Sequence, residues 1–429
     1  MGARILLAIA VSTATLLACG SGGQAAGSSS ADDASGGGSG GTPDAAAGSG
    51  MDSGSSGSTS ASGSGGSSGS NGSSGSSESS GSDSGGSSGS SGGSNSSGSS
   101  GAADSGGATA GGTAPCDIYQ SGATPCVAAH STVRALYQSY GGNLYQVRRA
   151  SDAATKDIGV LTTGGVAAAA LQDSFCSGTT CVITVVFDQS GHGNDLAYQG
   201  PGGAGGQDAA ANAASESLTA GGSKVYSLYI KPGNSYWRDG SSSGVPTGSA
   251  PEGIYMVTSG THVNAGCCFD YGNSETNRKV GGNGAMDAIN FGTECWFGSC
   301  SGSGPWVQAD LEDGLYQGGS ASSNANNRGV SSKFVTAMLK NNGTSTFALK
   351  GGSAQGGSLT TFYSGSLPPG FSPMHKQGAI VLGSGGDCCA TNTNQSDGTF
   401  YEGAIVSGYP SDTTDNSVQQ NVVVAGYGP

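Results

Sequence analysis

Aromatic and basic residues are scarce in this sequence, and from Gly20 to Gly112 they are missing altogether. This stretch consists almost entirely of Gly, Ser, Ala, Asp and Thr, so it cannot bury enough apolar surface to offset its chain entropy. We therefore expect residues 20–113 to form a disordered Gly/Ser-rich linker. The remaining residues, 114–429, are numerous enough for one folded domain with its own core.

The shortage of basic residues also limits the class of partner. Lys and Arg total 15 against 29 Asp and Glu, which gives a formal net charge of −14. No basic patch is evident, and this argues against a nucleic-acid partner. An acidic domain rich in Gly and Tyr is better suited to a neutral polysaccharide.

Several catalytic and metal-binding motifs are missing as well. The chain has no phosphate-binding Gly loop and no Gly-x-Ser-x-Gly elbow. It has no Cys-x-x-Cys pair, and its four histidines are scattered at positions 130, 192, 262 and 375. A zinc site is therefore not expected, and we predict neither a metal nor an organic cofactor.

The N-terminus has the pattern of an export signal. Arg4 precedes an apolar stretch, Ile5–Leu17, which is too short for a permanent membrane span. Ala18-Cys19 then resembles a bacterial lipoprotein processing site, so we expect residues 1–19 to be a signal peptide and Cys19 to be lipidated. The alternative is an ordinary signal peptide with an incidental cysteine. Both predict secretion, and the first predicts a lipid anchor at the outer cell surface.

Ten cysteines follow Cys19, and they fall into local groups, as is typical of disulfides formed in an oxidising compartment. Five short loops are the simplest connectivity. The pairs would be Cys116–Cys126, Cys176–Cys181, Cys267–Cys268, Cys295–Cys300 and Cys388–Cys389. Adjacent cysteines pair only through a strained eight-membered ring, so Cys267 and Cys268 have distant partners as the alternative. For the last adjacent pair, the alternative is cross-bonding with Cys295 and Cys300.

Residues 114–429 contain mainly short apolar runs separated by turns rich in Gly, Ser and Asn. This spacing predicts an all-β domain, most simply a β-sandwich. The expected strands are Val182–Phe187, Val225–Ile230, Ile254–Val257, Phe334–Leu339, Thr346–Leu349, Ala379–Leu382 and Gly403–Val406. Two helices are also expected, one beginning at Ser131 and one beginning at Asp412 or Thr413.

The segment Trp306–Glu312 alternates strictly between apolar and other side chains. The members that should face the core are Val307, Ala309 and Leu311. The members of the opposite face are Trp306, Gln308, Asp310 and Glu312. A solvated outer strand can show the same pattern, but the tryptophan favours a sugar site, because sugars stack on flat apolar surfaces and hydrogen-bond to carboxylates and amides.

Two further segments carry candidate site residues. In Gly378–Asp387 an apolar strand ends in a loop of small residues that delivers one carboxylate, Asp387, although a turn aspartate is the common alternative. In Cys267–Asn273 the adjacent cysteines precede the sequence Phe-Asp-Tyr-Gly-Asn. A strained pair of this kind tends to persist where it serves a site.

These segments together resemble the catalytic domain of glycoside hydrolase family 54, the α-L-arabinofuranosidases. The resemblance covers residues 115–427 and rests on "PCDIYQSGATPCVAAHSTVRALY", "FDQSGHGNDL", "CCFDYGNSE", "GPWVQADLED", "GAIVLGSGGD" and "GTFYEGAIVSGYPSD". It implies a lectin-like (concanavalin-like jelly-roll) β-sandwich and a retaining mechanism. By motif position, Glu312 matches the family's nucleophile and Asp387 its general acid/base. Retaining enzymes hold two such carboxylates about 5–5.5 Å apart.

The resemblance also implies the sugar contacts. Cys267–Cys268 matches a vicinal disulfide that forms a floor against the arabinose ring, and Trp296 matches an aromatic wall. Further positions that match sugar contacts are Asp310, Asp313 and Gly386. The family has Asn-Asn where this chain has Asp313-Gly314, and the pairs Cys295/Cys300 and Cys388/Cys389 are additional to the family pattern.

The expected function is therefore hydrolysis of terminal α-L-arabinofuranosyl residues from hemicellulose or pectin side chains, by a monomer. One alternative from another class is a surface carbohydrate-binding module without catalysis, which would need neither Glu312 nor Asp387 aimed at an anomeric carbon. The other is a related furanosidase or xylosidase of altered specificity.

Overall fold

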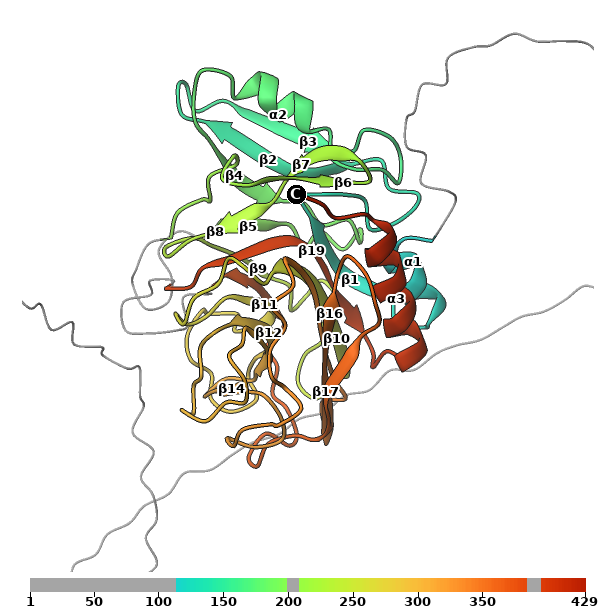
Figure 1. Cartoon of the computed structure of the whole chain (residues 1–429), viewed down its shortest axis with the longest axis vertical. Helices are drawn as coiled ribbons and strands as arrows, with labels where there is room; N and C mark the ends of the chain where they lie inside the picture. Colours follow the sequence, from blue (N-terminus) through green and yellow to red (C-terminus); the bar gives the residue numbers. More distant parts are fainter. Residues whose placement is uncertain (1–112, 199–207, 384–394) are drawn as a thin grey trace, which may run out of the picture. The chain divides into compact units, whose positions relative to one another are not determined.

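The computed structural model describes residues 113–198, 208–383 and 395–429, and these carry two large antiparallel β-sheets (Figure 1). The strands of the first sheet are β1 (Cys126–Ser131), β8 (Leu228–Ile230), β10 (Glu252–Ser259), β15 (Phe334–Asn341), β16 (Thr346–Ser353), β17 (Thr360–Ser366) and β19 (Gly398–Ser407). Its order is β1-β19-β10-β15-β16-β17, and β8 also pairs with β19.

The second sheet has ten strands and contains the candidate site. They are β2 (Asn143–Arg149), β3 (Thr155–Gly159), β4 (Cys181–Val186), β5 (Leu196–Tyr198), β9 (Ser235–Asp239), β11 (Asp270–Ser274), β12 (Asp287–Gly292), β13 (Trp306–Asp310), β14 (Leu315–Tyr316) and β18 (Ala379–Gly383). Their order is β14-β13-β12-β11-β18-β9-β5-β4-β2-β3. A separate hairpin joins β6 (Ser217–Ala220) to β7 (Ser223–Tyr226).

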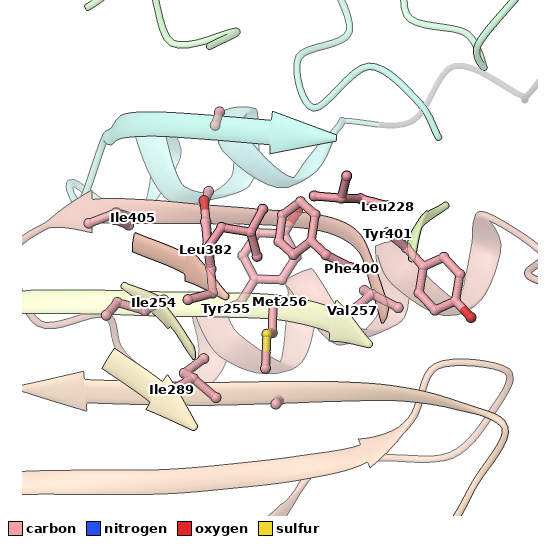
Figure 2. Close-up of a cluster of buried hydrophobic side chains, with 14 of the residues drawn as sticks. Leu228, Ile254, Tyr255, Met256, Val257, Ile289, Leu382, Phe400, Tyr401 and Ile405 are labelled. Atoms are coloured by element: carbon pink, nitrogen blue, oxygen red, sulfur yellow. The ribbon is translucent and has the colours of Figure 1, made fainter. Parts of the chain in front are cut away.

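The two large sheets share one hydrophobic core. Figure 2 shows Tyr255 and Phe400 from the first sheet beside Ile289 and Leu382 from the second, and all four side chains are fully buried. Each large apolar side chain buried in this way stabilises the fold by about 1.5–3 kcal/mol. Because both sheets contribute to the cluster, they pack face to face, and the predicted all-β sandwich is confirmed.

The predicted strands all occur, with one division. The run Val225–Ile230 is split at Ser227, so that β7 pairs with β6 whereas β8 pairs with β19. The main-chain N–H of Ser227 donates to Glu216 O at 3.3 Å, and its hydroxyl donates to the Glu216 carboxylate at 2.8 Å. These bonds fix the chain at the point where it passes from one sheet to another.

The helix predicted near Asp412 is confirmed as α3 (Asp412–Val424), and Ser411 supplies the N-cap by accepting a bond from Thr414 N–H. Its apolar positions Val418 and Val422 are buried, as predicted. Two short helices, α1 (Pro115–Ser121) and α2 (Ala169–Phe175), were not predicted. A signal for α1 exists in the sequence, since it has proline at the first helical position.

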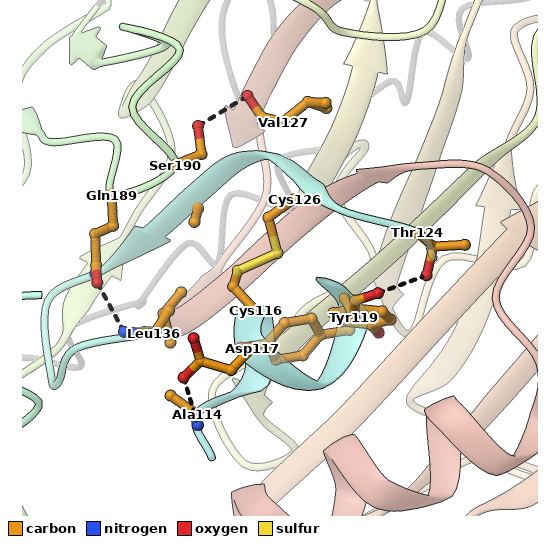
Figure 3. Close-up of a disulfide and its surroundings, with 12 residues drawn as sticks. Ala114, Cys116, Asp117, Tyr119, Thr124, Cys126, Val127, Leu136, Gln189 and Ser190 are labelled. Carbon is orange, nitrogen blue, oxygen red and sulfur yellow. Dashed lines mark hydrogen bonds between the residues drawn. A yellow bond between two sulfur atoms is a disulfide. The ribbon is translucent and has the colours of Figure 1, made fainter. Parts of the chain in front are cut away.

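The helix predicted to begin at Ser131 is wrong, because Ser131 is the last residue of β1 and no helix follows it. Its hydroxyl accepts a hydrogen bond from Val133 N–H at 3.0 Å, as a helix cap does. However, Leu136 N–H donates to Gln189 Oε1 at 2.7 Å instead of to a carbonyl four residues earlier (Figure 3). The N–H of Leu136, which a helix would need for its own hydrogen bonding, is thus bonded to the side chain of Gln189, more than 50 residues away.

Two disulfides close short loops near the N-terminal end of the described chain. Cys116–Cys126 joins α1 to β1 (Figure 3), and Cys176–Cys181 joins the end of α2 to β4. Both are pairs that the local grouping predicts. The predicted signal peptide, Cys19 and the predicted linker up to residue 112 lie outside the described residues. Among the residues that the structure describes, no helix is long and apolar enough to cross a membrane.

A buried ion pair joins five parts of the chain. Arg134 Nε donates to Glu402 Oε2 at 2.5 Å, and the side chain of Glu402, on β19, is fully buried. Tyr427 OH also donates to this carboxylate at 2.7 Å, and Tyr255 OH donates to it at 3.3 Å. Arg134 in turn donates to Asn421 Oδ1 of α3 at 2.9 Å. The carboxylate thus holds β10, β19 and the C-terminal residues, and its partner Arg134 adds α3 to the group.

We predict that Glu402→Gln lowers the free energy of unfolding by about 3–5 kcal/mol, because it leaves a buried guanidinium without its counter-charge. Urea denaturation of the purified domain measures this change. The matched control is Asp152→Asn, which breaks the exposed pair with Arg149 and should move the midpoint little. Equal losses in the free energy of unfolding for the two variants would show that the buried pair stabilises the fold no more than the exposed pair.

Candidate functional site

The site is built on the register of three neighbouring strands, β11, β12 and β13. Asp270 lies opposite Asn290, and Asn290 lies opposite Gln308. Asn290 Nδ2 donates to Asp270 Oδ1 at 3.0 Å, and Gln308 Nε2 donates to Asn290 Oδ1 at 3.2 Å and to Glu294 O at 3.0 Å. These side chains form a hydrogen-bonded polar row across one face of the second sheet.

The alternation predicted for β13 is confirmed on its apolar face. Val307, Ala309 and Leu311 are fully buried in the core. The opposite face is buried too, since Asp310 is 8% exposed and Glu312 is 7% exposed. The alternative of a solvated outer strand is therefore wrong, and the polar face of β13 is covered by other parts of the protein.

Glu312 lies just beyond the strand, which ends at Asp310. Its φ is 70°, and the φ of Asp313 is 55°, a region that residues other than glycine rarely adopt. Asp310 Oδ1 accepts a hydrogen bond from Glu312 N–H at 3.1 Å and so fixes this turn. Backbone of this kind persists where the surrounding structure holds it in place, often at functional sites.

The adjacent cysteines Cys267 and Cys268 are joined to each other by a disulfide across a cis peptide bond, at the start of the segment that leads into β11. The Sγ atom of Cys268 and a carboxylate oxygen from each of Asp270 and Asp310 lie within 4.8 Å of one another. Because the sulfur is part of a disulfide, it offers no thiolate to a metal. The disulfide therefore lies close to the carboxylates of Asp270 and Asp310, which come from strands β11 and β13 of the same sheet. Asp270 was not predicted as a site residue, although it stands two positions after the cysteine pair.

Trp296 stands in a loop that is closed by the Cys295–Cys300 disulfide and by a hydrogen bond from Gly298 N–H to Cys295 O at 3.0 Å. The indole is half-buried. Glu294 precedes this loop, and burial raises the pKa of its carboxyl group. The Cys295–Cys300 disulfide thus restricts the segment that carries the predicted aromatic wall.

Phe297 connects this loop to the turn after β13. A Cβ atom at Gly314 would lie 2.4 Å from Phe297 Cζ, so the ring occupies the space that a side chain there would need. Phe297 also contacts Tyr316, with ring centroids 5.0 Å apart. Because Phe297 follows Trp296 and Gly314 follows the exposed Asp313, this contact brings two predicted sugar-binding segments together. The sequence contains no signal for the pairing of Phe297 with Gly314.

Four predicted site residues lie outside the described residues, namely Gly386, Asp387, Cys388 and Cys389. The strand predicted before them is confirmed as β18, and it pairs with β11. The loop that carries Asp387 therefore begins beside the strand that follows the vicinal disulfide. The Cys295–Cys300 bond shows that cross-bonding of these two cysteines with Cys388 and Cys389 is wrong.

Comparison with known proteins agrees with this geometry. Residues 115–428 match the family described as "Alpha-L-arabinofuranosidase B, catalytic". The chain is 54% identical over 320 residues to the probable alpha-L-arabinofuranosidase B of Aspergillus fumigatus, which covers 73% of this chain and 62% of that protein. It is 53% identical over 320 residues to an arabinofuranosidase/B-xylosidase of Trichoderma koningii, with coverage of 73% and 63%.

A solved structure is similar over the same region. The crystal structure of an arabinofuranosidase complexed with arabinofuranosyl-alpha-1,2-xylobiose has a TM-score of 0.70 and 46% identity, and the match covers 74% of this chain and 66% of that chain. The present chain thus spans less than two thirds of the length of each of these relatives.

We predict that Gly314→Ala destabilises the domain by roughly 1–3 kcal/mol, because the new methyl group overlaps the Phe297 ring. The double variant with Phe297→Ala should lose less than the sum of the two single losses, since the overlap is then removed. Chemical denaturation of the four proteins gives the coupling energy. Gly298→Ala is the control, because Gly298 also has a positive φ but no atom lies within 4 Å of its Cβ position. Additive losses would contradict the contact.

We also predict that Cys388 and Cys389 pair with each other, as the grouping in the sequence suggests. Peptide mapping without reduction should yield a peptide with both cysteines that is two hydrogens lighter than the dithiol. A free thiol at either position, or a link to any other cysteine, would contradict this pairing.

Proposed function

Because the chain belongs to the family of α-L-arabinofuranosidase B catalytic domains, glycoside hydrolase family 54, we propose that it hydrolyses terminal, non-reducing α-L-arabinofuranosyl residues. The complex of a relative with arabinofuranosyl-alpha-1,2-xylobiose supports arabinose side chains of hemicellulose as the substrate class. Arabinose side chains of pectin present the same terminal sugar and are included in the proposal.

The observation that best supports this function is the meeting of Cys268, Asp310 and Glu312. The disulfide sulfur lies within 4.8 Å of a carboxylate oxygen of Asp310, and Asp310 accepts the N–H of Glu312 at 3.1 Å. An apolar disulfide surface and a buried carboxylate thus adjoin each other. A furanose ring resting on the disulfide would lie beside the carboxylate of Asp310 and next to the turn in which Asp310 holds Glu312.

In the proposed reaction Glu312 attacks the anomeric carbon and forms a covalent arabinosyl-enzyme intermediate. Asp387 protonates the leaving oxygen, and then it deprotonates the water that releases arabinose with retained configuration. Asp310 holds the turn of Glu312, so the nucleophile needs little reorganisation before attack. Neither a metal nor an organic cofactor takes part in this mechanism.

The remaining predicted residues would recognise the sugar. We propose that Cys267–Cys268 forms the floor under the ring and that Trp296 forms a wall beside it, because sugars present apolar faces to such surfaces. Asp310, Asp313 and the main chain of Gly386 would bind hydroxyl groups. Asp313 is exposed, so its contact with the sugar would be weaker than that of a buried carboxylate.

A xylosidase activity is the second candidate, and the arabinofuranosidase/B-xylosidase of Trichoderma koningii favours it. The two sugars expose similar hydroxyl groups, so one pocket can accept both to different extents. Comparing kcat/KM for the 4-nitrophenyl glycosides of α-L-arabinofuranose and β-D-xylopyranose would rank the two. Binding of arabinosyl oligosaccharides without any hydrolysis would instead indicate the carbohydrate-binding alternative.

The proposed setting of the enzyme is outside the cell. The disulfides in the described chain form in oxidising compartments, and the N-terminal pattern is that of a signal peptide. We propose that residues 1–19 direct export, that Cys19 carries a lipid anchor and that residues 20–113 form a flexible linker. Residues 114–429 would then act as a monomeric catalytic domain at the cell surface, with polysaccharide rather than nucleic acid as the partner.

We predict that Glu312→Gln lowers kcat on 4-nitrophenyl α-L-arabinofuranoside by at least roughly 1,000-fold, because the amide cannot act as the nucleophile. NMR of the first-formed product of the wild-type enzyme should show retained anomeric configuration. The control is Glu294→Gln, a change of the same kind beside Trp296, which should keep most of the activity. Wild-type turnover by Glu312→Gln, or an inverted product, would refute the assigned mechanism.

A further inference from the structure

The side-chain amide of Asn264, in the segment between β10 and the vicinal disulfide, is fully hydrogen-bonded. Its Oδ1 accepts bonds from Gly266 N–H at 3.0 Å and from Asp397 N–H at 3.1 Å. Its Nδ2 donates to Gln395 O at 3.0 Å and to Asp397 Oδ2 at 3.1 Å. An amide offers two hydrogens and two lone pairs, so this side chain uses its whole capacity.

One of these bonds is an ordinary local turn, whereas the other three reach a distant part of the chain. Gln395 and Asp397 are 131 and 133 residues away from Asn264, and in sequence they follow the segment that contains Asp387. The two segments touch backbone to backbone, since a Cβ atom at Gly266 would lie only 2.1 Å from Gln395 O. Position 266 therefore has no room for any residue other than glycine.

The main chain of Asn264 makes a third connection. Its carbonyl accepts a hydrogen bond from Thr293 N–H at 2.8 Å, and Thr293 stands three residues before Trp296. One residue thus joins the segment of the vicinal disulfide, the segment that leads to Trp296 and the segment Gln395–Asp397.

We propose that Asn264 is a positioning residue of the sugar pocket, which sets the distance between the disulfide floor and the Trp296 wall. The proposal rests on the proposed function, because it assumes that both features contact arabinose. Asn264 acts through these features and does not itself touch the sugar. A displacement of about 1 Å in such contacts lowers reaction rates by up to roughly 100-fold.

The charged groups near Asn264 allow the role of its two amide hydrogens to be tested by substitution. Asp397 Oδ2 accepts one of them, and Asp397 Oδ1 lies 3.7 Å from His262 Nε2. Burial lowers the pKa of His262, Asp397 opposes this shift, and Lys231 adds to it. The imidazole, which stacks on Tyr229, is therefore mostly neutral at pH 7. If a carboxylate replaced the amide of Asn264, it would lie beside the carboxylate of Asp397 and be repelled by it, because the mostly neutral His262 does not balance the two charges.

The decisive variant is Asn264→Asp, which keeps the size and the acceptor oxygen but replaces the two amide hydrogens by a negative charge. We expect kcat to fall roughly 10- to 100-fold at pH 7, with a smaller rise in KM. The ratio of variant to wild-type kcat should recover as the pH is lowered, because a proton shared by the two carboxylates restores the donated hydrogen bond. Asn264→Ala should lose activity without this recovery.

A matched control is Asn342→Asp in the turn between β15 and β16, where the side-chain oxygen accepts three main-chain N–H groups. This variant should keep wild-type kcat and its pH profile. Wild-type kinetics for both Asn264 variants would overturn the proposal. So would unfolding of both variants, or a parallel loss of stability and activity with no pH recovery, since either result indicates a purely structural role.

A second readout does not depend on activity. Asn264 variants should let a thiol reductant reach and open the Cys267–Cys268 bond several times faster than in the wild type, as measured by timed alkylation and peptide mapping. The Cys176–Cys181 bond in the same sample is the internal reference and should open at an unchanged rate. An unchanged rate at Cys267–Cys268 counts against the positioning role, whereas a wild-type enzyme that releases no arabinose counts only against the proposed function.

Discussion

The register of β12 between β11 and β13 is the constraint on which both the core and the candidate site depend. In this register Ile289 and Phe291 face the core, while Asn290 lies between Asp270 and Gln308 on the other face. Side chains alternate strictly along a strand, so a slip of one residue would exchange the two sets. The burial of the two apolar residues therefore also decides where the polar row lies.

A polar row that is buried must find its hydrogen-bond partners inside the protein, because each unpaired group is costly. Asn290 meets this need by donating to Asp270 while it accepts from Gln308. Beyond the row, Asp310 accepts a hydrogen bond from the N–H of Glu312 just after the end of β13. The same bonds that satisfy buried polar groups thus orient the proposed nucleophile.

The proposed sugar contacts lie on segments that leave the ends of these strands. Each segment is restrained by a different means: the disulfide between Cys267 and Cys268, the packing of Phe297 on Gly314, and the hydrogen bonds of Asn264. The end of a strand fixes where a loop begins but not where its middle lies. Contacts between loops are therefore needed to hold the residues of a pocket at fixed distances from one another. The Cys295–Cys300 bond strengthens this arrangement beside Trp296.

The sequence alone determined those features whose causes are local. Periodicity predicted α3 and some of the strands, among them β10, β15 and β18. Alternation predicted the two faces of Trp306–Asp310, and close spacing predicted the four disulfides that the structure describes, since each depends on residues close together in the sequence. Tertiary structure decided the rest. It prevented a helix after Ser131 by giving a nearby N–H donor to Gln189, it placed Asp270 beside Asp310, and it joined Asn264 to Asp397. These contacts connect residues that are tens to more than a hundred positions apart, and only the pairing of distant strands and the packing of the segments between them bring these residues together.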